Sequence, residues 1–232
     1  MARVLKRIRG PVDNREEIVS EHLISGPRPP ISVRQRSVGR GHARTFEIDT
    51  YTAATMAGSP NPDLGGLFDK HVSSEFEAKD ADATMETMTG DPTVIHVPVL
   101  TGGRGTQELH AFYRDWFIPA WPDDVEVEQV SRTVGSERVV DELIIRFTHT
   151  CEMPFWLPGI APTGCRVELP LVVVMGFDEG QVASEHIYWD QASLLSQIGL
   201  LVTANLPIAG SIQAQAIVDP AVALNGMIVQ RP

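Results

Sequence analysis

The sequence predicts an α+β fold in which helices come first and a curved, mostly antiparallel sheet follows. Apolar residues recur at helical spacing between residues 64 and 88 and again between residues 106 and 119. Runs of alternating apolar and polar residues then fill most of the chain from residue 125 to residue 189. Helices followed by strands are typical of α+β domains. A long sheet with few helices must curl around them, and the concave face of such a curl is a natural pocket.

Residues 1–62 are predicted to form an extended basic arm, because they are rich in Arg, Gly, Pro and Ser. One short helix around Asn14–Leu23, with Asn14 as its cap, is the expected exception. Residues 1–45 hold ten Lys and Arg residues against four Asp and Glu residues, and the rest of the chain holds nine against 26. The body is therefore acidic, and it does not suit nucleic acid, whose binding depends on neutralising phosphates.

A compact domain is expected over residues 63–202, followed by a tail over residues 203–232. The domain opens with helical spacing that predicts two helices meeting near Asp80, the second ending at Gly90. “PTVIHVPVL” follows as a short strand. The segment “GTQELHAFYRDWFIPAW” is then predicted to be a helix capped at Thr106 and stopped by Pro119.

Four strands and a closing helix complete the domain. The predicted strands are Val125–Gly135, Arg138–Cys151, Arg166–Phe177 and Gln181–Trp189. The helix that follows, “QASLLSQIGLL”, begins directly after Asp190, which suits an N-cap. The last thirty residues are interpreted as a tail with one or two short turns.

His149 ends an apolar stripe on the second of these strands. Alternate residues of a strand share a face, so His149 lies on the face of Leu143, Ile145 and Phe147, which must point inward. A buried histidine held by a backbone carbonyl is the simpler interpretation. The apolar loop that follows, with Phe155 and Trp156, instead suggests a flap beside a cavity mouth, and we place His149 in the pocket.

The motifs from residue 64 to about residue 202 resemble a known family. In order they are a helix, “TGGRGTQELHAFYRDWFIPAWPDD”, “FTHT” with the later “PTG”, and “SEHIYWDQASLLSQIGLL”. This order resembles the SnoaL-like polyketide cyclase branch of the nuclear transport factor 2-like superfamily. Residues 1–60 lie outside the resemblance.

The resemblance implies a cone-shaped α+β fold, in which a curved antiparallel sheet wraps around a long helix and an open-ended apolar cavity. It also implies dimerisation through the sheet. Enzymes of this kind, such as polyketide cyclases, ketosteroid isomerases, scytalone dehydratase and limonene epoxide hydrolase, work without organic cofactors and use carboxylates and histidines in the cavity. Other relatives are only binding or oligomerisation modules.

The last strand offers two rival sets of side chains: Glu185, Ile187 and Trp189 on one face, and Ser184, His186, Tyr188 and Asp190 on the other. A carboxylate in an apolar wall loses hydration, which makes it a usable general base or acid. The resemblance places the inward direction on the Glu185 side. A slip of one residue would exchange the two sets. An exposed edge charge is the simpler interpretation of Glu185, and a subunit interface is an alternative place for His186 and Tyr188.

Further residues complete the predicted site. His96 lies mid-strand between apolar neighbours, where it can face His149. His71 lies one helical turn before Glu75 and shares its face. The remaining substrate-binding candidates are aromatic residues that suit a core or rim equally well, and they are Tyr113, Trp116, Phe155, Trp156, Tyr188 and Trp189. Glu185, His149, His186 and Asp190 are the catalytic candidates.

We therefore expect a cofactor-independent cyclase, isomerase, dehydratase or epoxide/lactone hydrolase that acts on a small apolar metabolite. The alternative is a non-catalytic dimeric ligand-binding or scaffold domain, which a cone without an inward carboxylate would favour. No HExxH or CxxC spacing supports a metal site, and none is expected. No apolar run has the length of a membrane span and no signal peptide is visible, so a cytoplasmic homodimer without nucleic-acid or membrane partners is predicted.

Overall fold

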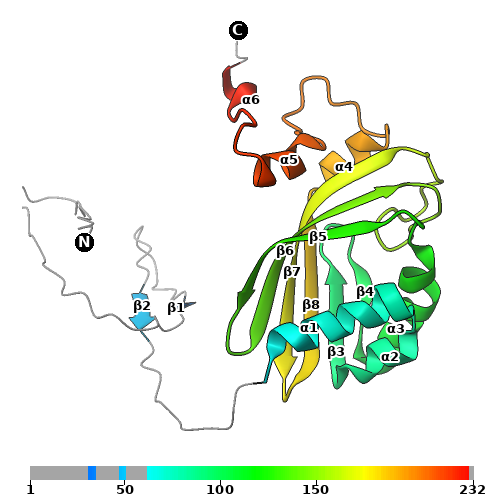
Figure 1. Cartoon of the computed structure of the whole chain (residues 1–232), viewed down its shortest axis with the longest axis vertical. Helices are drawn as coiled ribbons and strands as arrows, with labels where there is room; N and C mark the ends of the chain where they lie inside the picture. Colours follow the sequence, from blue (N-terminus) through cyan, green and yellow to red (C-terminus); the bar gives the residue numbers. More distant parts are fainter. Residues whose placement is uncertain (1–30, 35–46, 51–61, 230–232) are drawn as a thin grey trace, which may run out of the picture. The chain divides into compact units, whose positions relative to one another are not determined.

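The computed structural model describes residues 31–34, 47–50 and 62–229, and the chain divides into two compact units, Met1–Gly58 and Ser59–Pro232. In the first unit, strands β1 (Ile31–Arg34) and β2 (Glu47–Thr50) pair in antiparallel fashion. The sequence pattern does not predict this pairing. The helix expected near residues 14–23 lies outside the described residues. The second unit holds the main sheet and the helices (Figure 1).

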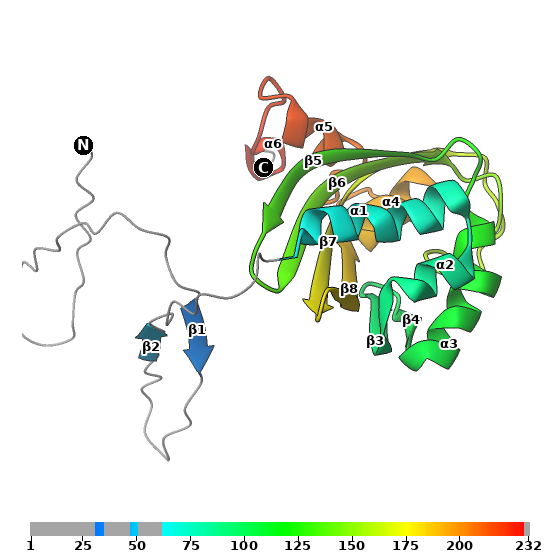
Figure 2. The same ribbon diagram turned by 60° about the horizontal axis from the view of Figure 1, so that its bottom comes forward.

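The main sheet has six strands in the order β4-β3-β8-β7-β6-β5. Their bounds are β3 Met88–His96, β4 Thr101–Arg104, β5 Glu126–Val134, β6 Arg138–Thr148, β7 Arg166–Asp178 and β8 Gln181–Trp189. Every neighbouring pair is antiparallel except β3 with β8, which is parallel. β5 and β6 arch over helix α1 (Leu64–Ser73), as Figure 2 shows. The predicted α+β class with a curved, mostly antiparallel sheet is confirmed.

The helices before the sheet meet where the sequence predicts. Helix α1 continues into a wide π-helical turn, Ser74–Ala78, which ends at Lys79 in the left-handed conformation (φ 52°). Asp80 then caps helix α2 (Ala81–Glu86), because its carboxylate accepts hydrogen bonds from the amides of Asp82 and Ala83. This polar break turns the chain and brings the two helices together.

Helix α3 spans Gly105–Phe112 and continues as a π-helical turn, Tyr113–Phe117, and a short 3₁₀ turn, Ile118–Ala120. The predicted cap at Thr106 is wrong. The N-cap is Arg104, two residues earlier, and the helix begins at Gly105, whose φ of 74° a glycine adopts at little cost. Its first turn is held by the Glu108 carboxylate, which accepts a hydrogen bond from the Arg104 amide at 2.7 Å.

The prediction that Gly90 ends a helix is wrong, because Gly90 lies inside β3. The segment “TGGR”, for which no strand is predicted, forms strand β4. Glycines hide the alternation by which a strand is recognised. Gly102 (φ 131°) fits because a Cβ there would lie 2.0 Å from the carbonyl oxygen of Val94, on the neighbouring strand.

Helix α4 (Gln191–Gln197) closes the domain as the sequence predicts. The segment interpreted as a tail contains two short helices, α5 (Ile212–Val218) and α6 (Gly226–Val229). α5 packs on β7, and Ala214 in α5 is fully buried. Within the described part of the chain, no helix has both the length and the apolar character needed to cross a bilayer.

The loop between β6 and β7 is part of the core rather than a flap. Phe155, Trp156 and Leu157 are at most 2% exposed. Trp156 stacks on Trp189 of β8 with ring centroids 4.8 Å apart, and the Phe155 carbonyl accepts a hydrogen bond from the Thr101 hydroxyl. This apolar run folds inward because its rings bury more area against other rings than a lid could.

Candidate functional site

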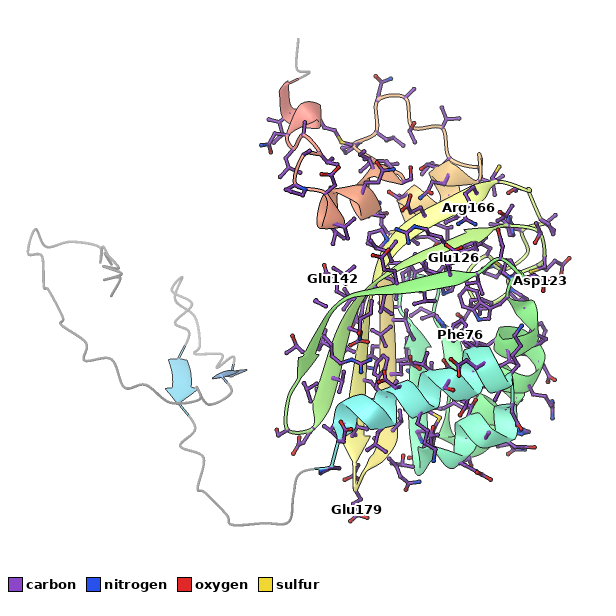
Figure 3. All side chains as sticks on the ribbon, in the orientation of Figure 1. Phe76, Asp123, Glu126, Glu142, Arg166 and Glu179 are labelled. Atoms are coloured by element: carbon purple, nitrogen blue, oxygen red, sulfur yellow. The ribbon has the colours of Figure 1, made fainter. Side chains whose placement is uncertain are left out.

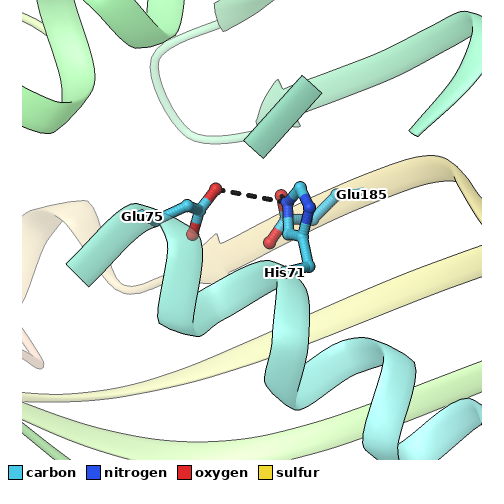
Figure 4. Close-up of side chains that lie close together, drawn as sticks. All are labelled: His71, Glu75 and Glu185. Carbon is cyan, nitrogen blue, oxygen red and sulfur yellow. Dashed lines mark ion pairs between the residues drawn. The ribbon is translucent and has the colours of Figure 1, made fainter. Parts of the chain in front are cut away.

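Three ionisable side chains meet inside the domain. His71 and Glu75 come from α1 and its π-helical turn, and Glu185 comes from β8 (Figure 4). The His71 Nε2 atom lies 3.3 Å from Glu75 Oε1 and 3.8 Å from Glu185 Oε2. Their exposures are 0%, 4% and 6%, so all three are withdrawn from water. Buried ionisable groups that lie this close together mark candidate functional sites.

Thr87 fixes the orientation of the His71 ring. Its hydroxyl donates to the Thr84 carbonyl at 2.6 Å, and it also lies 2.5 Å from His71 Nδ1. A hydroxyl has one proton to give, so Nδ1 must carry a hydrogen and donate it to Thr87. His71 therefore turns its Nε2 atom toward the two carboxylates.

Tyr113 completes the cluster. Its hydroxyl lies 3.3 Å from His71 Nε2, and its ring meets the His71 ring edge to face. Burial, reinforced by the charges of Glu75 and Glu185, raises the pKa of Tyr113 well above its usual range. The phenol keeps its proton at neutral pH and is available as a hydrogen-bond donor.

The charges of the cluster are interdependent. Burial alone would lower the pKa of His71, but the neighbouring Glu75 and Glu185 outweigh it and raise that pKa to about 10. Burial raises the pKa of Glu75 above its usual range, against the opposing pull of His71. His71 is therefore an imidazolium at neutral pH, and Glu75 holds a proton more readily than an ordinary glutamate.

One pocket reaches the cluster. It has a volume of about 310 Å³ and lies between the π-helical turn after α1 and the segment that leads into β5. Its lining includes Glu75 and is otherwise mainly apolar, with Phe76 and Asp123 at positions visible in Figure 3. Glu75 is the one member of the cluster that lines this pocket. A larger hollow of about 670 Å³ lies at the surface around the start of α3, and no residue of the cluster lines it.

The structure does not bring His149 to Glu185. Both side chains face the interior, but Glu185 is opposite Met175, which is opposite Val139, and His149 lies ten residues further along from Val139. That separation is roughly 30 Å along the strand. His149 is fully buried, its Nδ1 atom lies 3.2 Å from the Thr163 hydroxyl, and burial lowers its pKa. The expectation that the two share one cavity is wrong.

His96 lies in an aromatic cluster and does not face His149. Its ring centroid lies 5.6 Å to 5.8 Å from the rings of Phe112, Phe117, Phe155 and Trp189. Burial lowers the pKa of His96 to about 4. His96, Phe155, Trp156 and Trp189 were predicted to bind substrate, and the structure places all four in this packed interior.

The other predicted residues lie outside the cluster. On the outer face of β8, His186 is half-buried and Tyr188 is 44% exposed, and Trp116 is 53% exposed. The side chain of Asp190 caps α4 by accepting hydrogen bonds from the amides of Ala192 and Ser193. None of these side chains contacts the His71–Glu75–Glu185 group.

Two members of the site were not on the predicted list. Glu75 was noted only as a neighbour of His71, although a histidine and a glutamate four residues apart on a helix always share a face. That spacing is the signal that points to it. Thr87 gives no such signal, because it follows helix α2 and only the tertiary fold brings it to His71, sixteen residues earlier in the chain.

A curved sheet closed over helices, with buried carboxylates and a histidine at its centre, defines a cone-like α+β domain with a polar core site. The chain belongs to the SnoaL-like domain family, which matches residues 69–185. The resemblance drawn from the motifs is thereby confirmed. The matched range contains His71, Glu75 and Glu185.

Solved structures with similar folds are distant in sequence. A protein described as a SnoaL-like polyketide cyclase from Shewanella putrefaciens is 15% identical, with 60% of this chain and 88% of that chain covered and a TM-score of 0.49. TsrD from Streptomyces laurentii is 16% identical, with 60% and 96% covered and a TM-score of 0.47. A comparison with curated proteins finds no match.

Proposed function

We propose that this SnoaL-like domain is an enzyme that moves a proton on a small apolar metabolite without an organic cofactor. The observation that carries the proposal is a buried glutamate, Glu75, that lines a mainly apolar pocket and has His71 beside its carboxylate. A carboxylate in such surroundings exchanges protons with a bound substrate more readily than one in water.

Glu75 is assigned as the general base or acid, because it alone of the cluster lines the pocket. His71 holds its carboxylate in place and supplies positive charge beside it. Tyr113 does not line the pocket; its protonated hydroxyl is a hydrogen-bond donor inside the cluster, where it steadies the Glu75 carboxylate. Glu185 orients His71 from the β8 side. These roles replace the predicted partnership of Glu185 with His149.

Enolisation followed by ring closure, isomerisation, dehydration and opening of an epoxide or lactone all need a base and a hydrogen-bond donor. The cluster supplies the base, Glu75, at the pocket, which supports the enzyme over its alternative, a non-catalytic ligand-binding or scaffold domain of the same shape. A scaffold would gain nothing from two buried carboxylates, which are costly to desolvate.

Proton transfer to carbon is measurable without knowing the natural substrate. Chelator-treated protein is incubated in deuterium oxide with a panel of cyclic ketones and lactones, and deuterium incorporation next to the carbonyl is followed by nuclear magnetic resonance. Ring opening of epoxides is followed in the same samples. We expect the full chain to accelerate exchange of at least one class, and Glu75→Gln to lower that rate about 100-fold or more.

Glu77→Gln is the matched control, because Glu77 is exposed two residues away in the same turn. It should leave the rate unchanged, and circular dichroism should show both variants folded. Equal rates for Glu75→Gln and the parent would remove Glu75 from the chemistry. Compounds that bind in the pocket without any exchange or ring opening would favour the scaffold.

A further inference from the structure

The two buried carboxylates of the cluster have too little positive charge beside them. In the part of the chain that the structure describes, His71 is the only basic group within ion-pair distance of Glu75 or Glu185. Even as an imidazolium, it balances one carboxylate, so the second must either hold a proton or be met by a further cation. Uncompensated charge this far from water is strongly unfavourable, so such groups are usually paired or bound to a metal ion.

The three donor atoms are spaced as ligands of one cation. One donor atom from each of His71, Glu75 and Glu185 lies within 4.8 Å of the other two, and His71 Nε2 is 3.3 Å from Glu75 Oε1 and 3.8 Å from Glu185 Oε2. In four-coordinate zinc sites, bonds of about 2.0–2.1 Å put neighbouring ligand atoms about 3.3–3.4 Å apart. The His71–Glu75 separation matches this spacing, and the His71–Glu185 separation is slightly longer.

The surroundings of the histidine are those of a metal ligand. Thr87 accepts the Nδ1 hydrogen and passes its own hydroxyl hydrogen to a backbone carbonyl, so Nε2 is the ring nitrogen that faces the carboxylates and would bind a cation once the cation displaces its proton. Metal-binding histidines are normally held by this kind of outer hydrogen bond. The pocket supplies an entry path at Glu75, and Tyr113 lies where it can contact a fourth ligand.

We infer that His71, Glu75 and Glu185 form a binding site for a divalent cation of the zinc type. One imidazole and two carboxylates suit zinc, cobalt or manganese better than magnesium or calcium, which prefer oxygen ligands alone. A divalent cation with two carboxylates and a neutral imidazole is uncharged overall, which resolves the imbalance. The inference goes beyond the proposed function and does not depend on it, because cation binding is measured without turnover.

The test titrates the chelator-treated full chain with zinc chloride by calorimetry and with cobalt chloride by visible absorption. We expect one ion per chain, a cobalt spectrum of four- or five-coordinate character, and no comparable binding of magnesium. His71→Ala and Glu185→Gln should each weaken zinc binding about 100-fold or more, and Thr87→Val should weaken it 10- to 100-fold.

His110→Ala is the matched control, because His110 pairs with Asp82 at 2.7 Å on the surface and is the alternative histidine-carboxylate pair for adventitious zinc. It should leave the affinity unchanged. No binding by the parent chain, or equal losses in His110→Ala and His71→Ala, would overturn the inference. If His71→Ala fails to fold, the cobalt spectrum of the parent chain and the zinc affinity of Thr87→Val test the inference instead. Deuterium exchange by metal-free protein that binds no zinc would uphold the proposed function and reject the cation site.

Discussion

Two buried histidines take opposite charge states because of what surrounds them. His71 lies between carboxylates and its pKa is raised to about 10, whereas His96 lies among aromatic rings and its pKa is lowered to about 4. Both histidines are buried, so burial alone does not decide their charge states. The carboxylates that lie beside His71 make the difference.

The neutral state of His96 should make folding sensitive to acid. In the unfolded chain this histidine gains a proton near pH 6.5, but in the folded chain only near pH 4, so unfolding takes up a proton in between. Stability should therefore fall as pH falls through that window, by about 1.4 kcal/mol per pH unit at most. His96→Leu removes the titrating group, and its free energy of unfolding relative to the parent should rise by about 2 kcal/mol from pH 7 to pH 5.

Chemical denaturation of both proteins at the two pH values measures this change. His110→Gln, at a partly exposed surface position, should run parallel to the parent. Parallel profiles for His96→Leu would mean that His96 gains its proton in the folded chain as easily as in the unfolded one.

At the scale of elements, Asp190 belongs to the helix that follows it. Its carboxylate accepts hydrogen bonds from the Ser193 hydroxyl at 2.7 Å and the Gln213 amide at 3.2 Å, besides the two backbone amides of the cap. These bonds join α4 to α5 and lower the pKa of Asp190, although burial opposes them.

Asp190→Ala should lower the free energy of unfolding by about 1 kcal/mol, the usual value of an N-cap. Asp190→Asn keeps an oxygen for the backbone amides and should recover most of the loss. Both variants should keep the rate of deuterium exchange, since Asp190 contacts no member of the cluster. A large loss of exchange in folded Asp190→Asn would return this residue to the catalytic candidates.

Strand parity predicts the face on which Glu185 lies, because period-two alternation along β8 is unbroken from Glu185 to Trp189. Helical spacing likewise places His71 beside Glu75. What the sequence does not reveal is which end of one strand meets which helix, since that depends on register and curvature across the whole sheet. For this reason the sequence suggests a pairing of His149 with Glu185 and gives no sign of Thr87. β4 escapes prediction for another reason: its glycines interrupt the alternation of side chains by which a strand is recognised.

At the scale of the whole molecule, the buried core of the described chain begins at Leu64. We therefore predict that removing residues 1–58 leaves a folded domain, and that trypsin, which cuts after the many arginines of that segment, produces a stable fragment. The deletion variant should unfold cooperatively within a few degrees of the full chain. Loss of that transition would show that the basic segment stabilises the domain.

The outer face of the sheet keeps apolar groups that one chain does not cover. Tyr188 is 44% exposed and Val172, opposite it on β7, is half-buried, although α5 covers part of β7. We predict a homodimer through this face. Sedimentation at micromolar concentration should show a dimer, and Tyr188→Glu should shift it toward monomer. A monomer at every concentration would contradict the prediction.

The parallel pairing of β3 with β8 joins segments that are about ninety residues apart in the sequence. β8 is the last strand to leave the ribosome, yet it lies in the middle of the sheet and carries Glu185. A nascent chain that ends before residue 181 thus has an open seam between β3 and β7, with His71 and Glu75 already made but unpartnered on that side. Long-range pairing of this kind slows folding. The polar centre is consequently among the last parts of the domain to assemble during synthesis, and until then the seam is where a chaperone would have to act.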